Sequence, residues 1–159
     1  GVTYKNGPLQ GTFTYGYDKQ SQYPAAQKGN KQQYALGLGY DYGVVKVLGS
    51  DEAVKNAGYV SKNADNNLYT LGVIVPVSKM GKVSFGYAQQ DNDVKDSDGK
   101  GYVLAYEHSM SKRTTLYTAF FRGTNESVAT NQAPGRFGTT NTAGDDKYNG
   151  IAFGMRHDF

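Results

Sequence analysis

The sequence predicts an all-β protein whose antiparallel strands follow one another as a meander. Eight segments of about ten residues alternate apolar side chains with small or polar ones, which is the two-residue period of a strand. The connections between these segments are alternately short and long. The 14 Tyr, 7 Phe and 21 Gly residues point the same way, because aromatic side chains favour strands and glycines suit tight turns.

Composition argues against several other classes of protein. The longest run without a charged or strongly polar residue, Leu71–Val77, is far short of the roughly 20 residues that a membrane-spanning helix needs. The 17 Lys and Arg residues are scattered and the formal net charge is +3, so we expect no nucleic-acid partner. Since there is no cysteine, disulfides and thiol-ligated metals are excluded.

The first four predicted strands place apolar side chains at every second position. They cover residues 9–19, 32–41, 44–50 and 67–77. Three of them alternate clearly, as in 67–77, where Leu71 and Val73 flank Gly72. Alternation is weaker in 44–50, because Leu48 stands on the same side as Lys46.

The last four predicted strands complete the meander. They cover residues 82–90, 101–109, 113–122 and 149–159, and residues 2–4 have the pattern of a short remnant of another strand. Alternation in 113–122 fits either face, and we expect Tyr117, Ala119 and Phe121 to share the apolar side with Arg122 opposite. The last strand ends the chain on an aromatic residue, Phe159.

The connections predict how these strands are closed into a fold. The short ones lie at residues 5–8, 41–43, 78–81 and 110–112, and the long ones at 20–31, 51–66, 91–100 and 124–147. Short turns at one end and long loops at the other are typical of outer-membrane barrels, whose periplasmic turns are short. We therefore expect a transmembrane antiparallel β-barrel, with the loop 124–147 outside the cell.

Aromatic residues gather where the two membrane interfaces would cross such a barrel. With the long loops outside, the outer strand ends carry Tyr17, Tyr34, Tyr69, Tyr102 and Phe121, and the inner ends carry Tyr40, Tyr106 and Phe159. Tyrosine is enriched at membrane interfaces because its ring is apolar and its hydroxyl is polar. These residues are predicted to form two girdles, with Phe159 at the periplasmic rim.

Charged residues on the other rows are predicted to line a water-filled pore. They are Asp18, Lys46, Lys82, Glu107, Arg122, Arg156 and Asp158. Four basic minus three acidic groups gives a charge of +1 on this part of the wall. Since Lys and Arg raise the local concentration of anions, we expect a mild anion preference.

Five stretches of the sequence resemble a known family. They are YKNGPLQGTFTYGYD from Tyr4, YALGLGYDYGVVKV from Tyr34, YTLGVIVPVSKMGKVSFGYAQQD from Tyr69, YEHSMSKRTTLYTAFFRG from Tyr106 and GIAFGMRHDF from Gly150. The chain thereby resembles the C-terminal half of the β-proteobacterial general porins, of the Neisseria, Bordetella and Comamonas type. The turn Ser111–Thr114 and the terminal Arg156–Phe159 carry this resemblance most specifically.

The resemblance implies a homotrimer of 16-stranded barrels in the bacterial outer membrane, through which ions and small hydrophilic solutes diffuse passively without a cofactor. It also implies contact with outer-membrane lipid and lipopolysaccharide, and recognition of Phe159 by the β-barrel assembly machinery. Eight strands are half of the family's number. We therefore expect residues 1–159 to be the C-terminal half of one barrel domain, and the family's constriction loop to belong to the other half.

Three other classes of protein are alternatives to a porin. A complete eight-stranded outer-membrane barrel would act as an anchor or adhesin, but such barrels are filled by side chains, and inward glycines such as Gly37, Gly72 and Gly150 would leave it underfilled. A soluble lectin-like sandwich does not need alternating short and long loops. An outer-membrane enzyme would need an acid, a base and a nucleophile that converge, and no such set is evident.

We expect no catalytic or metal site. Ser111 with His108 and Asp91 has the residue types of a hydrolytic triad, but no nucleophile elbow surrounds the serine. His108 and His157 fall on membrane-facing rows near the periplasmic rim. The aspartates between residues 91 and 98 resemble a calcium loop without its closing glutamate.

Overall fold

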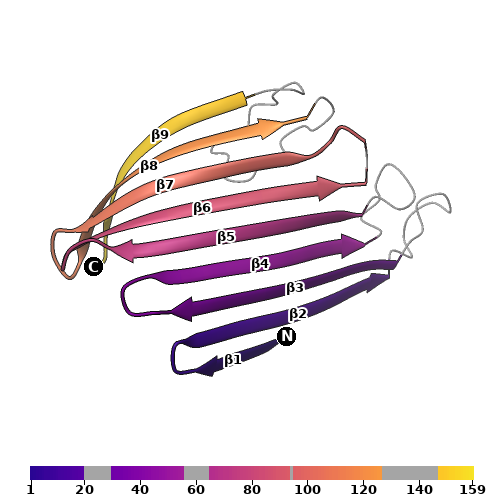
Figure 1. The fold of residues 1–159 in the computed structure, drawn as a ribbon, viewed down its shortest axis with the longest axis horizontal. Coiled ribbons are helices and arrows are strands. Elements are labelled where there is room, and N and C mark those ends of the chain that lie inside the picture. Colours follow the sequence, from indigo (N-terminus) through magenta and orange to yellow (C-terminus); the bar gives the residue numbers. More distant parts are fainter. Residues whose placement is uncertain (20–29, 56–64, 94, 127–146) are drawn as a thin grey trace.

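The computed structural model describes residues 1–19, 30–55, 65–93, 95–126 and 147–159. These residues form one nine-stranded antiparallel sheet, in which strands adjacent in the chain are adjacent in the sheet (Figure 1). The expected all-β meander is confirmed. Within these ranges, no helix has the length and apolar character needed to cross a membrane.

The described residues contain nine strands rather than the expected eight. They are β1 (Val2–Asn6), β2 (Leu9–Lys19), β3 (Asn30–Asp41), β4 (Lys46–Lys55), β5 (Asn66–Pro76), β6 (Gly81–Asn92), β7 (Gly99–Ser109), β8 (Thr114–Asn125) and β9 (Lys147–His157). The segment expected as a remnant at 2–4 is a full strand that pairs with β2. All strands but β1 have 10 to 12 residues, about the length of a tilted transmembrane strand.

Strand β4 is longer than its sequence predicts. Residues 51–55 were expected to begin a polar loop, yet they continue the ladder, with Asp51 opposite Leu36 of β3 and Tyr69 of β5. Both neighbouring strands offer backbone partners at these positions. Hydrogen bonding across the ladder therefore outweighs the low strand preference of charged residues.

The two ends of the sheet differ as expected. Short turns join β1 to β2, β3 to β4, β5 to β6 and β7 to β8 at one end, and the longer connections leave from the other end (Figure 1). Gly7 and Gly43 have φ of 54° and 83°, which glycine adopts readily. In the β3–β4 turn the Tyr42 N–H donates to the Val45 carbonyl at 2.9 Å. Most of the predicted loop 124–147 lies outside the described residues.

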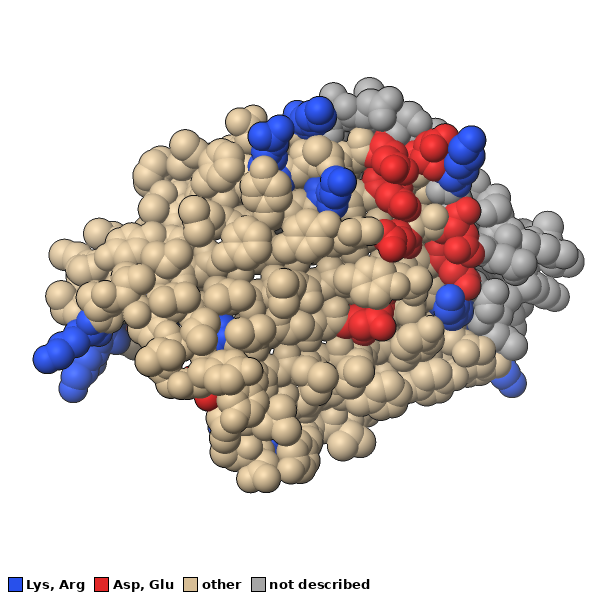
Figure 2. Space-filling model, in the orientation of Figure 1, with Lys and Arg blue, Asp and Glu red and all other residues tan. Residues whose placement is uncertain are grey.

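The register sorts side chains into two faces, because residues paired across a ladder point to the same side of the sheet. The apolar face carries Phe13, Leu36, Leu38, Leu71, Val73, Phe85, Leu104, Phe120, Ile151, Phe153 and Met155. The opposite face carries Thr12, Gly37, Ser50, Thr70, Gly72, Ser84, Ala105, Ala119, Gly150 and Gly154. Figure 2 shows a broad uncharged surface, with acidic groups gathered toward the long-loop end.

The apolar face has no protein layer over it. Ala53 is the only apolar residue that is buried among those described, whereas Phe153 is 79% and Leu104 50% exposed. Along β7 and β9, exposure alternates with the faces, and the opposite-face residues are the less exposed. The sheet therefore curves toward the opposite face. Such a large exposed apolar surface needs a solvent other than water, which argues against the soluble sandwich.

The expected orientation of β8 is wrong. Arg122 pairs with Tyr102 and so lies on the apolar face, whereas Tyr117 and Phe121 lie on the opposite face. Both rows of this strand contain aromatic residues, so alternation alone does not distinguish them. Strand β9 places glycines beside the β8 aromatics: Gly150 pairs with Phe121. A side chain at Gly150 would collide with the Phe121 ring, so glycine leaves the room that this ring occupies.

The end of the chain also differs from its prediction. Strand β9 ends at His157, so Phe159 lies beyond the strand and is fully exposed. The Asp158 N–H donates to the Arg113 carbonyl at 2.9 Å. Arg113 lies in the β7–β8 turn, just before β8 begins. Phe159 therefore has no ladder partner. Its ring instead packs edge-on against His157, with 4.9 Å between the ring centroids.

Candidate pore-lining face

The middle of the opposite face is built from small and hydroxyl-bearing residues. Ser50 and Thr70 lie directly opposite each other on β4 and β5, and their hydroxyl oxygens are 2.7 Å apart. Glycines 37 and 39 on β3 leave a hollow of about 310 Å³ beside Leu48. A surface of hydroxyl groups and exposed backbone can be wetted by water, whereas the apolar face cannot.

On the described part of the opposite face, charged residues occur only near the two ends of the strands. Near the short turns they are Lys5, Asp41, Lys46, Lys82, Glu107, Arg156 and Asp158, and near the long connections they are Asp18, Lys31 and Glu52. Five basic minus five acidic groups gives zero net charge on the described part of this face. The excess of +1 predicted from the sequence is therefore wrong.

Moving Arg122 to the other face accounts for the whole difference in charge. Arg122, counted as a pore-lining residue, lies on the apolar face. The four residues that were missed cancel, because two are basic, Lys5 and Lys31, and two are acidic, Asp41 and Glu52. Glu52 was missed because β4 was expected to end before it. Asp41 and Lys31 were also missed, although Asp41 lies on the alternating row within residues 32–41 and Lys31 lies one residue before that segment.

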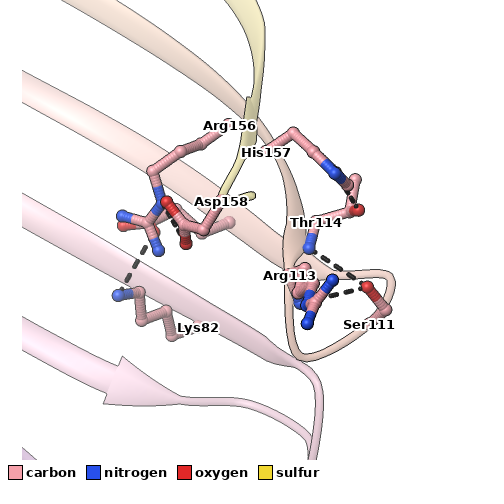
Figure 3. Close-up of polar contacts among 8 residues, drawn as sticks. Lys82, Ser111, Arg113, Thr114, Arg156, His157 and Asp158 are labelled. Atoms are coloured by element: carbon pink, nitrogen blue, oxygen red, sulfur yellow. Dashed lines mark hydrogen bonds and ion pairs between the residues drawn. The ribbon is translucent and has the colours of Figure 1, made fainter.

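Two ion pairs lie at the turn end of this face. The Lys82 Nζ is 3.2 Å from the Glu107 Oε2, and these residues are directly opposite each other on β6 and β7. The Arg156 Nε is 3.7 Å from the Asp158 Oδ2, and both side chains are about two-thirds exposed, at 67% and 64%. Figure 3 shows Lys82, Arg156 and Asp158 extending over the same side of the sheet. Each pair reduces the local field, and exposed pairs add little stability.

The other predicted pore-lining residues lie where alternation puts them. Asp18, Lys46, Lys82, Glu107 and Arg156 all occupy the opposite face. With Asp158, which extends over the same side (Figure 3), the structure brings six of the seven predicted residues to one face, and it divides them between the two rims.

The predicted girdle tyrosines all lie on the apolar face. Tyr17, Tyr34, Tyr69 and Tyr102 are near the long-loop end, and Tyr40 and Tyr106 are near the short turns. At the turn end the Tyr106 hydroxyl is 3.1 Å from the His108 Nδ1. Phe121, on the opposite face, does not belong to this set. The six predicted girdle tyrosines therefore border the apolar face at both ends.

Among the residues that the structure describes, those with catalytic or metal-binding chemistry do not converge. The Ser111 hydroxyl accepts the backbone N–H groups of Arg113 and Thr114, both at 3.1 Å, and so holds the β7–β8 turn (Figure 3). Asp91 and His108 lie at opposite ends of the sheet. In the described ranges, no three His, Asp or Glu side chains gather as metal ligands would.

Together these features define a class of protein. An antiparallel meander with strands of membrane-crossing length, an uncovered apolar face and a wettable opposite face is a segment of a transmembrane β-barrel wall. A family model described as Gram-negative porin matches residues 1–128. The chain belongs to this family, and its place is the bacterial outer membrane.

Two relatives show how much of a porin is present. The chain is 32% identical over 160 residues to outer membrane porin protein 32 of Delftia acidovorans, covering 99% of this chain and 45% of the relative. It is also similar to the structure of an anion-selective porin from Comamonas acidovorans, with a TM-score of 0.85 and 28% identity over 99% of this chain and 47% of that one. The chain thus spans about half the length of the relatives that it matches.

Proposed function

We propose that this chain is the C-terminal half of the wall of an outer-membrane channel, through which ions and small hydrophilic solutes diffuse passively. The observation that carries the proposal is the two-faced sheet, with an uncovered apolar side and a wettable side that is uncharged at mid-height. Within the described residues β1 and β9 pair only with β2 and β8, so the sheet is open at both edges. Further strands, about as many again, would close it into a barrel.

The two faces of the sheet have different roles in the channel. Asp18, Lys46, Lys82, Glu107 and Arg156 line the water-filled interior. The tyrosines at both borders of the apolar face are girdle residues at the two interfaces of the membrane. Phe159 is fully exposed, so the assembly machinery can bind it.

The position of the channel in the outer membrane determines which molecules contact it. The apolar face contacts the acyl chains of membrane lipid, and its long-loop border reaches the lipopolysaccharide of the outer leaflet. Three barrels associate as a homotrimer. The chain acts as a channel rather than an enzyme, and it needs no cofactor.

A complete small barrel that serves as an anchor or adhesin is less well supported. Nine strands that are adjacent in sequence give a sheet whose first and last strands do not meet in the described part of the chain. The glycines and hydroxyl residues of the opposite face would not fill the interior of a narrow barrel.

Conductance of the intact protein in planar bilayers tests the channel and its selectivity. The Comamonas relative is named as anion-selective, but the described wall here is neutral, so the preference should be weak on this half. Arg156→Glu is expected to shift the reversal potential toward cations in a gradient of low salt, because screening over about 10 Å at 0.1 M leaves nearby charges effective.

The matched control for this change is Arg122→Glu, which alters the same charge on the apolar face. Arg122→Glu should give the same reversal potential as the unchanged protein. If both substitutions shifted the potential equally, the assignment of the two faces would be wrong. If the intact protein formed no channel at all, the proposed function itself would fail.

The orientation in the membrane can be tested with single cysteines, since residues 1–159 contain none. Lys95 lies in the β6–β7 connection and Lys112 in the β7–β8 turn, and both are exposed. A membrane-impermeant maleimide added to intact cells is expected to label Lys95→Cys and not Lys112→Cys. After the outer membrane is permeabilised, both should react. The reverse pattern in intact cells would place the short turns outside.

A further inference from the structure

Three basic side chains from adjacent strands meet at the long-loop border of the apolar face. Lys100 of β7 pairs with Thr124 of β8, which pairs with Lys147 of β9. Arg122 lies one step nearer the middle of the same face, between Lys100 and Lys147. Since neighbouring strands are about 4.8 Å apart, the backbones of the two lysines are roughly 10 Å apart. Three long side chains at this spacing can reach one anionic group.

These three cations are exposed and have no ion-pair partner in the described part of the chain. The nearby carboxylates are held by other donors. Asp98 accepts the Asn92 N–H at 2.8 Å, and Glu126 accepts the Asp98 N–H at 3.2 Å. On β6, Asp91 accepts the side-chain amide of Gln89 at 2.7 Å. None of these carboxylates is ion-paired with Lys100, Arg122 or Lys147 in the described part of the chain, but Asp98 and Glu126 keep their negative charge and line the same border.

The same border contains a hollow into which an anionic group can fit. It has a volume of about 340 Å³ and is lined chiefly by Gln89, Asp98, Lys100, Thr124, Glu126 and Lys147. Lys100 and Lys147 thus stand at the rim of a shaped recess rather than on a flat surface. The Thr124 hydroxyl offers an additional hydrogen bond to an oxygen atom.

The height of this cluster on the sheet indicates what it binds. Arg122 is level with Tyr102, and on the side toward the middle its neighbours are apolar, as Leu104 and Phe120 show. The cations therefore begin where the apolar surface ends. In the proposed orientation this is the headgroup level of the outer leaflet, where the anions are phosphates carried by lipid.

Charge along the border also fixes where on the sheet the ligand would lie. Over β4–β6 the same border of the apolar face carries Asp51 and Asp91, and Figure 2 shows acidic groups gathered beside the basic ones. A phosphate would be repelled there. At the β7–β9 side the three cations outnumber the two carboxylates of the hollow, Asp98 and Glu126. Guanidinium groups bind phosphate in a bidentate way and lysines bind it as point charges, so β7–β9 is the favoured side.

We propose that Lys100, Arg122 and Lys147 form a binding site for a phosphate group of lipopolysaccharide in the outer leaflet. This inference rests on the proposed function, because it requires the apolar face to meet lipid and the long loops to lie outside. The site gives this porin a fixed contact with one lipid on the β7–β9 side of its wall.

Binding of lipid A that carries both phosphates, measured by native mass spectrometry on the intact protein in detergent, tests this site. The variant K100Q/R122Q/K147Q is expected to bind it at least tenfold more weakly, since each cation at an anionic lipid surface contributes roughly a fivefold gain in affinity. The matched control K79Q/K112Q/R113Q removes two lysines and one arginine from the short turns and should bind as the unchanged protein does. Lipid A without phosphates should bind to all three proteins equally weakly.

Equal affinity of the two triple variants, or equal affinity for both forms of lipid A, would overturn the site. Binding of inorganic phosphate as tight as that of lipid A would overturn the lipid as its source. If the triple variant does not fold, R122Q alone should show a loss of about fivefold, and K100R/K147R should retain binding. Channel conductance is measured separately, so a protein that conducts but fails the lipid test refutes this site alone.

Discussion

Leu104→Arg is expected to destabilise the folded protein in a lipid bilayer by about 2–4 kcal/mol. Leu104 lies near the middle of β7 on the apolar face, is 50% exposed and has Phe85 and Phe120 as its ladder neighbours. An arginine here would face hydrocarbon without a partner. The cost is greatest at the membrane midplane and falls toward either interface, where the side chain can reach water.

The matched control is Ala105→Arg, one residue further along the same strand. Ala105 lies on the opposite face between Ser84 and Ala119, where a long polar side chain can extend into water. Urea unfolding in lipid vesicles would give both values. Equal damage at the two positions would mean that the interior is packed, and it would favour a narrow barrel over a pore.

Gly154→Val is expected to cost about 1–3 kcal/mol of folding free energy, because it overfills a packed position. A Cβ at Gly154 would collide with the ring of Tyr117 on β8, which pairs with it. Relieving the collision requires the Tyr117 ring, which is 43% exposed, to leave its place over Gly154. The same unfolding measurement in vesicles checks this value.

Gly16→Val is the control for the substitution at Gly154. Gly16 is also a strand glycine on the opposite face, but a Cβ there would meet Gln33 at ordinary contact distances of 3.8 and 3.9 Å. Gly16→Val should therefore lower the folding free energy far less than Gly154→Val does. Tyr117→Ser should relieve most of the cost of Gly154→Val, and a double-mutant cycle would measure this coupling. Additive effects would contradict a direct clash between these two residues.

Much of this architecture could be read from the sequence because its signals are local. The period of two identified eight of the nine strands, and glycine-containing turns marked where the hairpins close. Alternation also placed Lys82, Glu107 and Arg156 together, since each belongs to a strand with only one apolar row. The uneven loop lengths and the aromatic borders then indicated a membrane barrel.

What the tertiary structure alone decided depends on neighbouring strands. Alternation divides a strand into two rows, but it does not say which row faces which side when both rows carry aromatic residues, as in β8. The pairing of Tyr102 with Arg122 settled that point, and the glycines of β9 made space for the aromatic row beside them. Likewise Asp51 joined β4 because partners on both sides completed its backbone hydrogen bonds. Strand periodicity is a property of one segment, whereas the face, register and extent of a strand are set by the segments that pair with it.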